Sequence, residues 1–375
     1  MQSYPHRINP LKSLLKSAGV KGAIIAGFVS LIFLMLLSPA NAQDCDKDLK
    51  KNNSKNFLTI AFENDSIGSG EDQNYTSGLR ATYFDHKEKV PEFFKKFEEW
   101  FPSLKDNLPT PDKKNEMSVY YSVGQNLYTP NDIGNPAQDL NDRPWAAFLY
   151  GSLGVYLDTE KTGKSIDEFE FTLGVVGPAA LGKQAQTVVH KHITNSTIPL
   201  GWGNQLENEP GFILSWQHRW WPDELDWEVP TFFKQKKLNI SVGPHLGASL
   251  GNVYTYANAG FSFRISSEKS ANSDMPIRVR PALPGTGKFE VDGWGWSLFG
   301  GLEGRAVARN IFLDGNTFES SHSVTKYPFV SDANIGIAIE VWKLRLSYTL
   351  VSRSKEFKTQ GKSELFGAAS LSYMF

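Results

Sequence analysis

The sequence predicts an all-β fold, a twelve-stranded antiparallel transmembrane β-barrel with one short helix on its extracellular side. Apolar and polar residues alternate in segments of about ten residues along most of the chain, as in membrane strands with one lipid-facing and one lumen-facing side. The chain holds 10 Trp, 13 Tyr and 25 Phe, yet its mean hydropathy is only -0.34. After residue 42 no segment approaches 18 consecutive apolar residues, which leaves a soluble fold or a barrel.

The first 42 residues have the layout of a secretory signal peptide. Four basic residues precede an apolar run over 22–37, and Ala40-Asn41-Ala42 supplies a small-residue cleavage site. A transmembrane anchor is the alternative, but the run is shorter than the roughly 20 residues that span a bilayer. We therefore expect a signal peptide over 1–42, a short polar leader over 43–56 and an outer-membrane β-barrel over 57–375.

Twelve segments carry the strand pattern, and an even number suits a single-chain bacterial barrel. The clearest segment places Leu344, Leu346 and Tyr348 on one face, with Arg345 and Ser347 on the other. A soluble β-sandwich is the alternative, but it would have shorter strands and a packed interior rather than a polar one. The predicted strands lie near 57–65, 76–86, 117–127, 146–157, 167–177, 211–221, 237–251, 253–265, 293–309, 334–342, 344–352 and 364–375.

Strand counting assigns the connections to the two sides of the membrane. With the amino end in the periplasm, the tight Trp342-Lys343 turn is periplasmic, as short turns of such barrels are.

A long periplasmic insertion has apolar residues at helical spacing over 90–104, which fits an interfacial amphipathic helix or a helix that covers the barrel. The chain ends on Phe375, which resembles the signature that the barrel-assembly machinery recognises. The segments predicted to face the exterior are 66–75, 128–145, 178–210, 310–333 and 353–363.

Charge and cysteine content exclude other classes of protein. A formal net charge of -1 gives no sign of nucleic-acid binding or of an acidic disordered tail. The one cysteine, Cys45, excludes an intramolecular disulfide and a cysteine-rich zinc site. It lies in the polar leader without the features of a nucleophile, so we expect it to be structurally idle.

A first polar cluster lies where the first predicted strand ends. Glu63-Asn64-Asp65 follows that strand, and the polar run 72–78 opens the next one. Carboxylate and amide oxygens suit a hard cation such as Ca²⁺, whose sites tolerate irregular geometry. A solvated hairpin tip is the alternative, because acidic loop tips are common.

A second cluster, Asn141-Asp142-Arg143-Pro144-Trp145, leads into an aromatic strand. The guanidinium of Arg143 is a permanently charged fork that can hold a phosphate or carboxylate of a substrate. Alternatively it pairs with Asp142 or another acid of the barrel and braces the loop. The pattern leaves both interpretations open.

A third cluster begins at Gly177-Pro178, after which residues 183–193 are predicted to form a short helix. Gln186 and His190 are four residues apart and therefore share one helix face. A histidine there can act as a general base while the glutamine orients its ring or a water molecule. An exposed surface histidine is the alternative. His192 points elsewhere and is left out of the site.

Taken in order, these segments resemble the LpxR-type lipid A 3-O-deacylase family of outer-membrane β-barrels. The resemblance covers most of the chain after the leader, up to the loop over 354–360. Its specific parts are Asn64-Asp65, Tyr75-Thr76-x-Gly78, Asp142-Arg143, Gly177-Pro178 with Gln186 and His190, and Asn204-Gln205-Leu206-Glu207-Asn208.

The resemblance implies a calcium-dependent ester hydrolase that removes the acyl chain at the 3-position of lipid A. It implies His190 as the base that activates water, Gln186 as its helper, and Asn64, Asp65 and Thr76 as the rest of the site, with Asn64 and Asp65 holding Ca²⁺. Some members carry a second acid after the Asn-Asp pair, where this chain has Ser66. Strand alternation also sets Asn64 on the face of Phe62 and Asp65 on the opposite face, so the two converge only if the chain twists at the rim.

The expected surroundings are the bacterial outer membrane and the lipopolysaccharide of its outer leaflet, with the active site facing the exterior. Two other functions fit the fold. One is a non-enzymatic barrel, either a pore or a structural protein. The other is a phospholipid esterase, although the serine nucleophile beside a histidine that outer-membrane phospholipase A uses has no evident counterpart here.

Overall fold

The computed structural model describes residues 56–65, 67–68, 74–85, 116–159, 164–194, 196–230, 237–271, 273–290 and 293–375. The predicted signal peptide, Cys45 and the helix over 90–104 lie outside the described residues. Two compact units are present. The barrel unit comprises Ser54–Lys183 and Pro199–Phe375, while Gln184–Ile198 belongs to the second unit.

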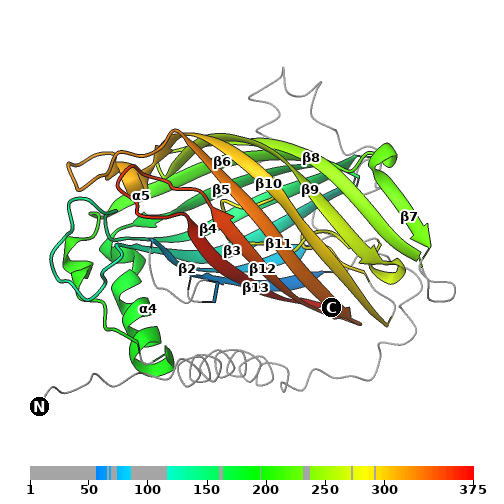
Figure 1. The fold of residues 1–375 in the computed structure, drawn as a ribbon, viewed down its shortest axis with the longest axis horizontal. Helices are drawn as coiled ribbons and strands as arrows, with labels where there is room; N and C mark the ends of the chain where they lie inside the picture. Colours follow the sequence, from blue (N-terminus) through cyan, green and yellow to red (C-terminus); the bar gives the residue numbers. More distant parts are fainter. Residues whose placement is uncertain are drawn as a thin grey trace, which may run out of the picture. The chain divides into compact units, whose positions relative to one another are not determined.

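The described strands form a closed antiparallel β-barrel (Figure 1). Neighbouring strands pair along the chain, and the pairings of β1 with β13 and of β6 with β8 close the ring. Its strands are β1 (Phe57–Asn64), β2 (Asn74–Asp85), β3 (Glu116–Thr129), β4 (Ala146–Thr159), β5 (Ser165–Val176), β6 (Glu209–Trp220), β8 (Lys237–Gly251), β9 (Tyr254–Ser267), β10 (Trp294–Asn310), β11 (Phe329–Val341), β12 (Leu344–Arg353) and β13 (Glu364–Met374). The predicted twelve-stranded barrel is confirmed, although β11 begins before its predicted start at 334.

A further short strand, β7 (Asp226–Pro230), pairs with the first residues of β8. It runs in the same direction as β6, which pairs with the later part of β8. A break containing Pro222 and a 3₁₀ turn (Asp223–Leu225) separates the two segments. Proline donates no backbone hydrogen bond, so the ladder is interrupted there, and the sequence pattern predicted only the first segment.

Side chains alternate between the two faces of the wall, as the period-two pattern predicts. In β11, Ile335, Ile337 and Ile339 are exposed on the outside, whereas Asp332 and Glu340 are buried on the inside. Lipid can accept the outer face, while the inner charges need partners. The alternation therefore decides which chemistry each face must carry.

The helices are short and lie in the connections. They are a 3₁₀ turn (Pro178–Ala180), α4 (Gly182–Val189), a π-helical turn (His190–Thr194), 3₁₀ turns at Gly201–Asn204 and Glu268–Ser270, and α5 (Ile311–Asp314). The helix predicted over 183–193 is confirmed by α4 and the turn after it. Among the described residues, no helix has the length and apolar character that crossing a membrane requires.

Buried charges inside the barrel are held in ion pairs. Arg80 contacts Glu170 at 2.6 Å, and Arg305 contacts Asp332 at 2.8 Å. Arg353 approaches the same Asp332 at 2.9 Å. Removing a charge from water is costly unless it is paired and hydrogen-bonded, so these pairs make a polar interior compatible with folding.

Residues 273–290, between β9 and β10, form a plug segment inside the barrel that the sequence analysis did not predict. Ile277, Val279 and Phe289 are buried. Arg278 lies 2.8 Å from Glu63 of β1 and donates a hydrogen bond of 2.7 Å to Asn334 of β11. The plug segment is thus bound to β1 and β11, which are separated in the ring by β13 and β12.

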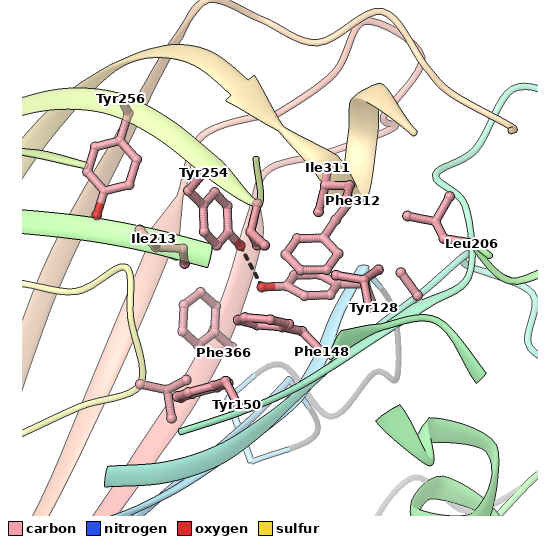
Figure 2. Close-up of a cluster of buried hydrophobic side chains, with 14 of the residues drawn as sticks. Tyr128, Phe148, Tyr150, Leu206, Ile213, Tyr254, Tyr256, Ile311, Phe312 and Phe366 are labelled. Carbon is pink, nitrogen blue, oxygen red and sulfur yellow. Dashed lines mark hydrogen bonds between the residues drawn. The ribbon is translucent and has the colours of Figure 1, made fainter. Parts of the chain in front are cut away.

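A layer of buried aromatic and aliphatic side chains, the aromatic layer, lies inside the barrel beside α5 (Figure 2). Tyr128 stacks on Phe312 with 3.9 Å between ring centroids, and its hydroxyl shares a 2.7 Å hydrogen bond with that of Tyr254. Phe148 and Phe366 are buried in the same cluster. We call this end of the barrel the loop end, because the connections β1–β2, β3–β4, β5–β6, β10–β11 and β12–β13 emerge there.

The pairing of the plug segment can be tested by a double-mutant cycle. Arg278→Met leaves Glu63 as an uncompensated buried charge, so we expect the free energy of unfolding in urea to fall by about 3 to 5 kcal/mol. Adding Glu63→Gln removes that charge and should restore part of the loss. Lys358→Ala, at an exposed loop position, is the control. Additive losses in the double variant would contradict the pairing.

Candidate functional site

Asn64 ends β1 at the rim of the barrel. Its backbone lies opposite Ser77 of β2 and Gly367 of β13. Glu63 faces the lumen and Arg278, so alternation places Asn64 on the outer face with Phe62. Asp65, the next residue, is buried. Asn64 therefore holds the outer position that alternation predicts, while Asp65 lies beyond the end of the strand, where a turn begins.

Thr76 lies in β2 close to this point. The β2–β3 register shifts between Tyr75 and Ser77, so Thr76 is the extra residue of a bulge. Ser77, which follows it, pairs with Asn64. Bulges occur often where a strand ends or redirects a side chain. The backbone thus brings Thr76 and Asn64 together across two neighbouring strands.

The start of α4 is fixed on the outer wall of the barrel. Gln125, on the outer face of β3, donates a hydrogen bond of 2.6 Å to the carbonyl oxygen of Ala180. A Cβ on Gly182 would lie only 2.5 Å from Cβ of Ala147 and 2.6 Å from the Trp202 ring. The chain therefore leaves the rim and folds down against β3 and β4 before the second compact unit begins.

His190 is held by backbone groups of its own unit. Its Nδ1 lies 2.6 Å from the carbonyl oxygen of Thr197, and its own carbonyl accepts a 3.0 Å bond from the amide of Ser196. A carbonyl only accepts, so Nδ1 carries the proton and Nε2 keeps the lone pair that a general base needs. Gln186, one turn earlier, and His190 are both buried. Because they belong to the second unit, their joint action with Asn64 and Asp65 stays a prediction.

Arg143 has the contacts of a loop brace. Its side chain is fully buried, it contacts Glu356 at 2.8 Å, and its guanidinium lies over the rings of Tyr128 and Phe357. Burial alone would raise the pKa of Glu356, but the guanidinium groups of Arg143 and Arg353 outweigh it and hold that pKa below its ordinary value. These contacts match the bracing interpretation, and the role as a phosphate ligand stays a prediction.

Other residues of the loop end tie the connections together. Asp142 accepts a hydrogen bond of 2.8 Å from the amide of Asn131, and its carbonyl bonds His322 at 2.7 Å. The side chain of Asn208 accepts from the amide of Ala179 at 2.7 Å, which joins the two ends of the β5–β6 connection. Sequence reasoning missed His322, because nothing in the spacing links it to residues 180 positions away.

The donor set around β1 fits a hard cation in chemistry. Asn64, Asp65 and Thr76 offer amide, carboxylate and hydroxyl oxygens, the donor types that Ca²⁺ prefers. Among the described residues, no group of three or more His, Cys, Asp or Glu side chains is arranged to hold a metal ion. Of the three predicted ligands only Asp65 supplies a carboxylate, so amide, hydroxyl, backbone or water oxygens would contribute to a calcium site here.

A cavity of about 390 Å³ lies inside the barrel toward the end opposite the loop end. Its lining includes Asp158, Lys164, Asn239 and Arg264 from strand ends and their connections, together with Lys288 of the plug segment. None of the six predicted site residues lines it. The predicted chemistry and this cavity are thus separate features.

The fold and the site define the class of protein: an outer-membrane β-barrel with a filled lumen and polar motifs at its loop end. The family model described as "Outer membrane protein LpxR" matches residues 28–375, and the chain belongs to this family. The solved structure of LpxR from Salmonella typhimurium is similar, with a TM-score of 0.64 and 20% identity over 85% of this chain and 100% of that one.

The β-domain of the Bordetella autotransporter BrkA has a TM-score of 0.38 and 8% identity, over 86% of this chain and 99% of that one. A search of curated proteins found no match.

The filled lumen predicts that the barrel does not conduct ions. In planar bilayers, the purified protein should show no steady conductance, because the aromatic layer and the plug segment occupy the interior. An open porin measured in the same bilayers is the control for insertion and detection. Reproducible channel steps from the wild-type protein would favour the pore alternative.

The brace predicts a pH-dependent loss of stability in Arg143→Met. At pH 7 the free energy of unfolding should fall by about 3 to 5 kcal/mol, because Glu356 loses its buried partner. The folded pKa of Glu356 is lowered, so this stabilisation is present above the ordinary glutamate pKa of about 4.3 and disappears as the pH falls through the folded value.

Urea unfolding followed by tryptophan fluorescence at pH 7 and near pH 3 measures this difference, with Lys358→Ala as the control. The difference between Arg143→Met and wild type should shrink at the lower pH. Unchanged stability at pH 7 would instead favour the interpretation of Arg143 as a substrate ligand.

Proposed function

We propose that this protein is a calcium-dependent lipid A deacylase that hydrolyses the ester-linked acyl chain at the 3-position. The observation that carries the proposal is the outward position of Asn64, one of the motif residues on which the family resemblance rests. Ion pairs, aromatic rings and the plug segment occupy much of the lumen behind it. Oxygen donors on the outer wall suit a substrate that is itself a membrane lipid.

In this proposal His190 is the general base. Nε2 takes a proton from water, and the resulting hydroxide attacks the ester carbonyl carbon. The tetrahedral intermediate then breaks its bond to the sugar oxygen, which recovers the proton from His190 and leaves as a hydroxyl group beside the released fatty acid. The bond between Nδ1 and the Thr197 carbonyl keeps the ring in the tautomer that this step needs.

Gln186 shares the helix face of His190 and would orient the attacking water or the ring. Asn64, Asp65 and Thr76 would hold the calcium ion. When bound, the ion stabilises the negative charge that develops on the carbonyl oxygen, so no covalent intermediate with the protein is required. The chain's own contribution is to fix these oxygen donors at the end of β1 and at the bulge of β2.

The proposal orients the loop end toward the exterior and its outer leaflet, where lipid A is located. The lipid A phosphates gather divalent cations at that surface. The barrel-assembly machinery would insert the chain by its carboxyl-terminal strand, which ends on Met374 before the terminal Phe375. A phospholipid esterase would use the same outer wall but release a different product.

Mass spectrometry of lipid A from cells that express the protein tests the proposal. Wild type should remove one ester-linked acyl chain, and His190→Ala should lower the rate by at least about 100-fold, the scale of a lost general base. His192→Ala is the matched control, because His192 is an exposed histidine two positions away in the same turn.

A membrane assay with and without a calcium chelator supplies the second arm. Activity should depend on the added ion. Unmodified lipid A in every sample would overturn the proposal, and release of fatty acid from phospholipid alone would move the function to the second alternative.

A further inference from the structure

We infer that Tyr348 and Gly367 are positioning residues for the calcium-binding end of β1. Together they form an outer-wall seat on β12 and β13, on which Ile67 and Gly68 rest. The inference deepens the proposed function and rests on it for the role of calcium. The contacts of the seat itself stand independently of that role.

The turn after β1 folds back over the outside of the barrel. The amide of Gly68 donates a 3.0 Å hydrogen bond to the carbonyl oxygen of Asp65, which closes the turn. The hydroxyl of Tyr348 donates a 2.8 Å bond to the carbonyl oxygen of Ile67. The carbonyl of Asp65 is thus bonded within the turn, and the carbonyl of Ile67 is bonded by β12, the second strand from β1 around the ring.

Gly367 provides the surface under the turn. On the outer face of β13, Leu365 and Tyr373 are exposed, whereas Gly367 is buried. A Cβ at Gly367 would lie 2.9 Å from Cγ1 of Ile67 and 3.0 Å from both the Ile67 carbonyl oxygen and the Tyr348 hydroxyl. Any larger residue there must push the turn away from the wall or break the hydrogen bond.

A second glycine confirms how close the turn lies to the wall. A Cβ on Gly68 would lie 2.5 Å from the backbone of Phe366. Backbone approach of this kind is possible only where side chains are absent. The turn is therefore in direct contact with the β13 backbone, beside the Asn64–Gly367 pair of the ladder.

The seat satisfies a backbone hydrogen-bond acceptor at the lipid-facing wall. The Ile67 carbonyl has left the strand ladder, and a backbone carbonyl near hydrocarbon needs another hydrogen-bond partner. Tyr348 supplies it with a side chain that is otherwise placed among lipid-facing leucines. Because this turn begins at Asp65, directly after Asn64, holding it against the wall limits the directions that the oxygens of both residues can take.

The test compares two seat variants with two matched controls. Tyr348→Phe removes only a hydroxyl, and Gly367→Ala adds only a methyl group. Tyr373→Phe and Gly304→Ala make the same changes elsewhere on the outer wall, and a Cβ at Gly304 would meet only the Ala259 carbonyl oxygen at 3.9 Å. Heat-modifiable gel migration reports folding, and Tyr348→Phe keeps the test valid if Gly367→Ala does not fold.

Three quantities are measured on each full-length protein in detergent. Calcium titration by calorimetry should show a dissociation constant raised about tenfold in both seat variants, the scale of lost outer-shell support for a metal ligand. The calcium concentration for half-maximal activity should rise with it, while KM for lipid A stays unchanged. Hydrogen exchange over residues 64–68 should be faster only in the seat variants.

Calcium binding and exchange equal to wild type in both seat variants would overturn the inference, even if wild type is an active deacylase. If the wild type binds calcium but modifies no lipid A, the proposed function is overturned. The calcium dissociation constants of the seat variants still test the positioning role in that case. Wild type that binds no calcium would overturn both the metal role and the positioning role.

Discussion

Closure of the hydrogen-bonded ring is the constraint on which the rest of the structure depends. Within hydrocarbon no water can satisfy a backbone amide or carbonyl, so every strand needs two neighbours. The β1–β13 and β6–β8 pairings supply the last of them. Once the ring is closed, alternate side chains must point inward, and a narrow interior lined by arginine and carboxylate side chains is stable only when they are paired, as Arg80 and Glu170 are.

Ion pairs, the aromatic layer and the plug segment occupy much of the interior, and the predicted site residues of the barrel unit lie at the loop end. Two chain segments fold back onto the outer wall. The hydroxyl of Tyr348 bonds the turn that begins at Asp65, and the side chain of Gln125 bonds the segment that ends at Gly182. Both adjoin the motifs on which the family resemblance rests. Polar groups on the outer wall lie where a membrane lipid can reach them without entering the barrel, as the proposed function requires.

Period-two alternation predicted the strands because it reports which face of the wall each residue occupies. It does not show which side chains across the barrel pair with one another. The plug segment was missed because its mixed apolar and charged residues resemble an ordinary connection, and the pairing of Arg143 with Glu356 joins residues 213 positions apart. The helix that carries Gln186 and His190 was predictable from local spacing, whereas the Thr197 carbonyl that sets the histidine tautomer depends on how the following turn folds.

Polar side chains that interrupt a lipid-facing row near the rim show where the wall is covered. Gln125 breaks the outer row of β3 and bonds the Ala180 carbonyl, and the Tyr348 hydroxyl bonds the Ile67 carbonyl. Each would be costly if it faced lipid alone. Asn64 interrupts the outer row of β1 in the same way. Its position follows the same rule: an outer-face polar residue beside a loop that returns to the wall marks a place where the barrel meets something other than hydrocarbon. At β1 the amide and carboxylate oxygens suit the cation of the proposed function.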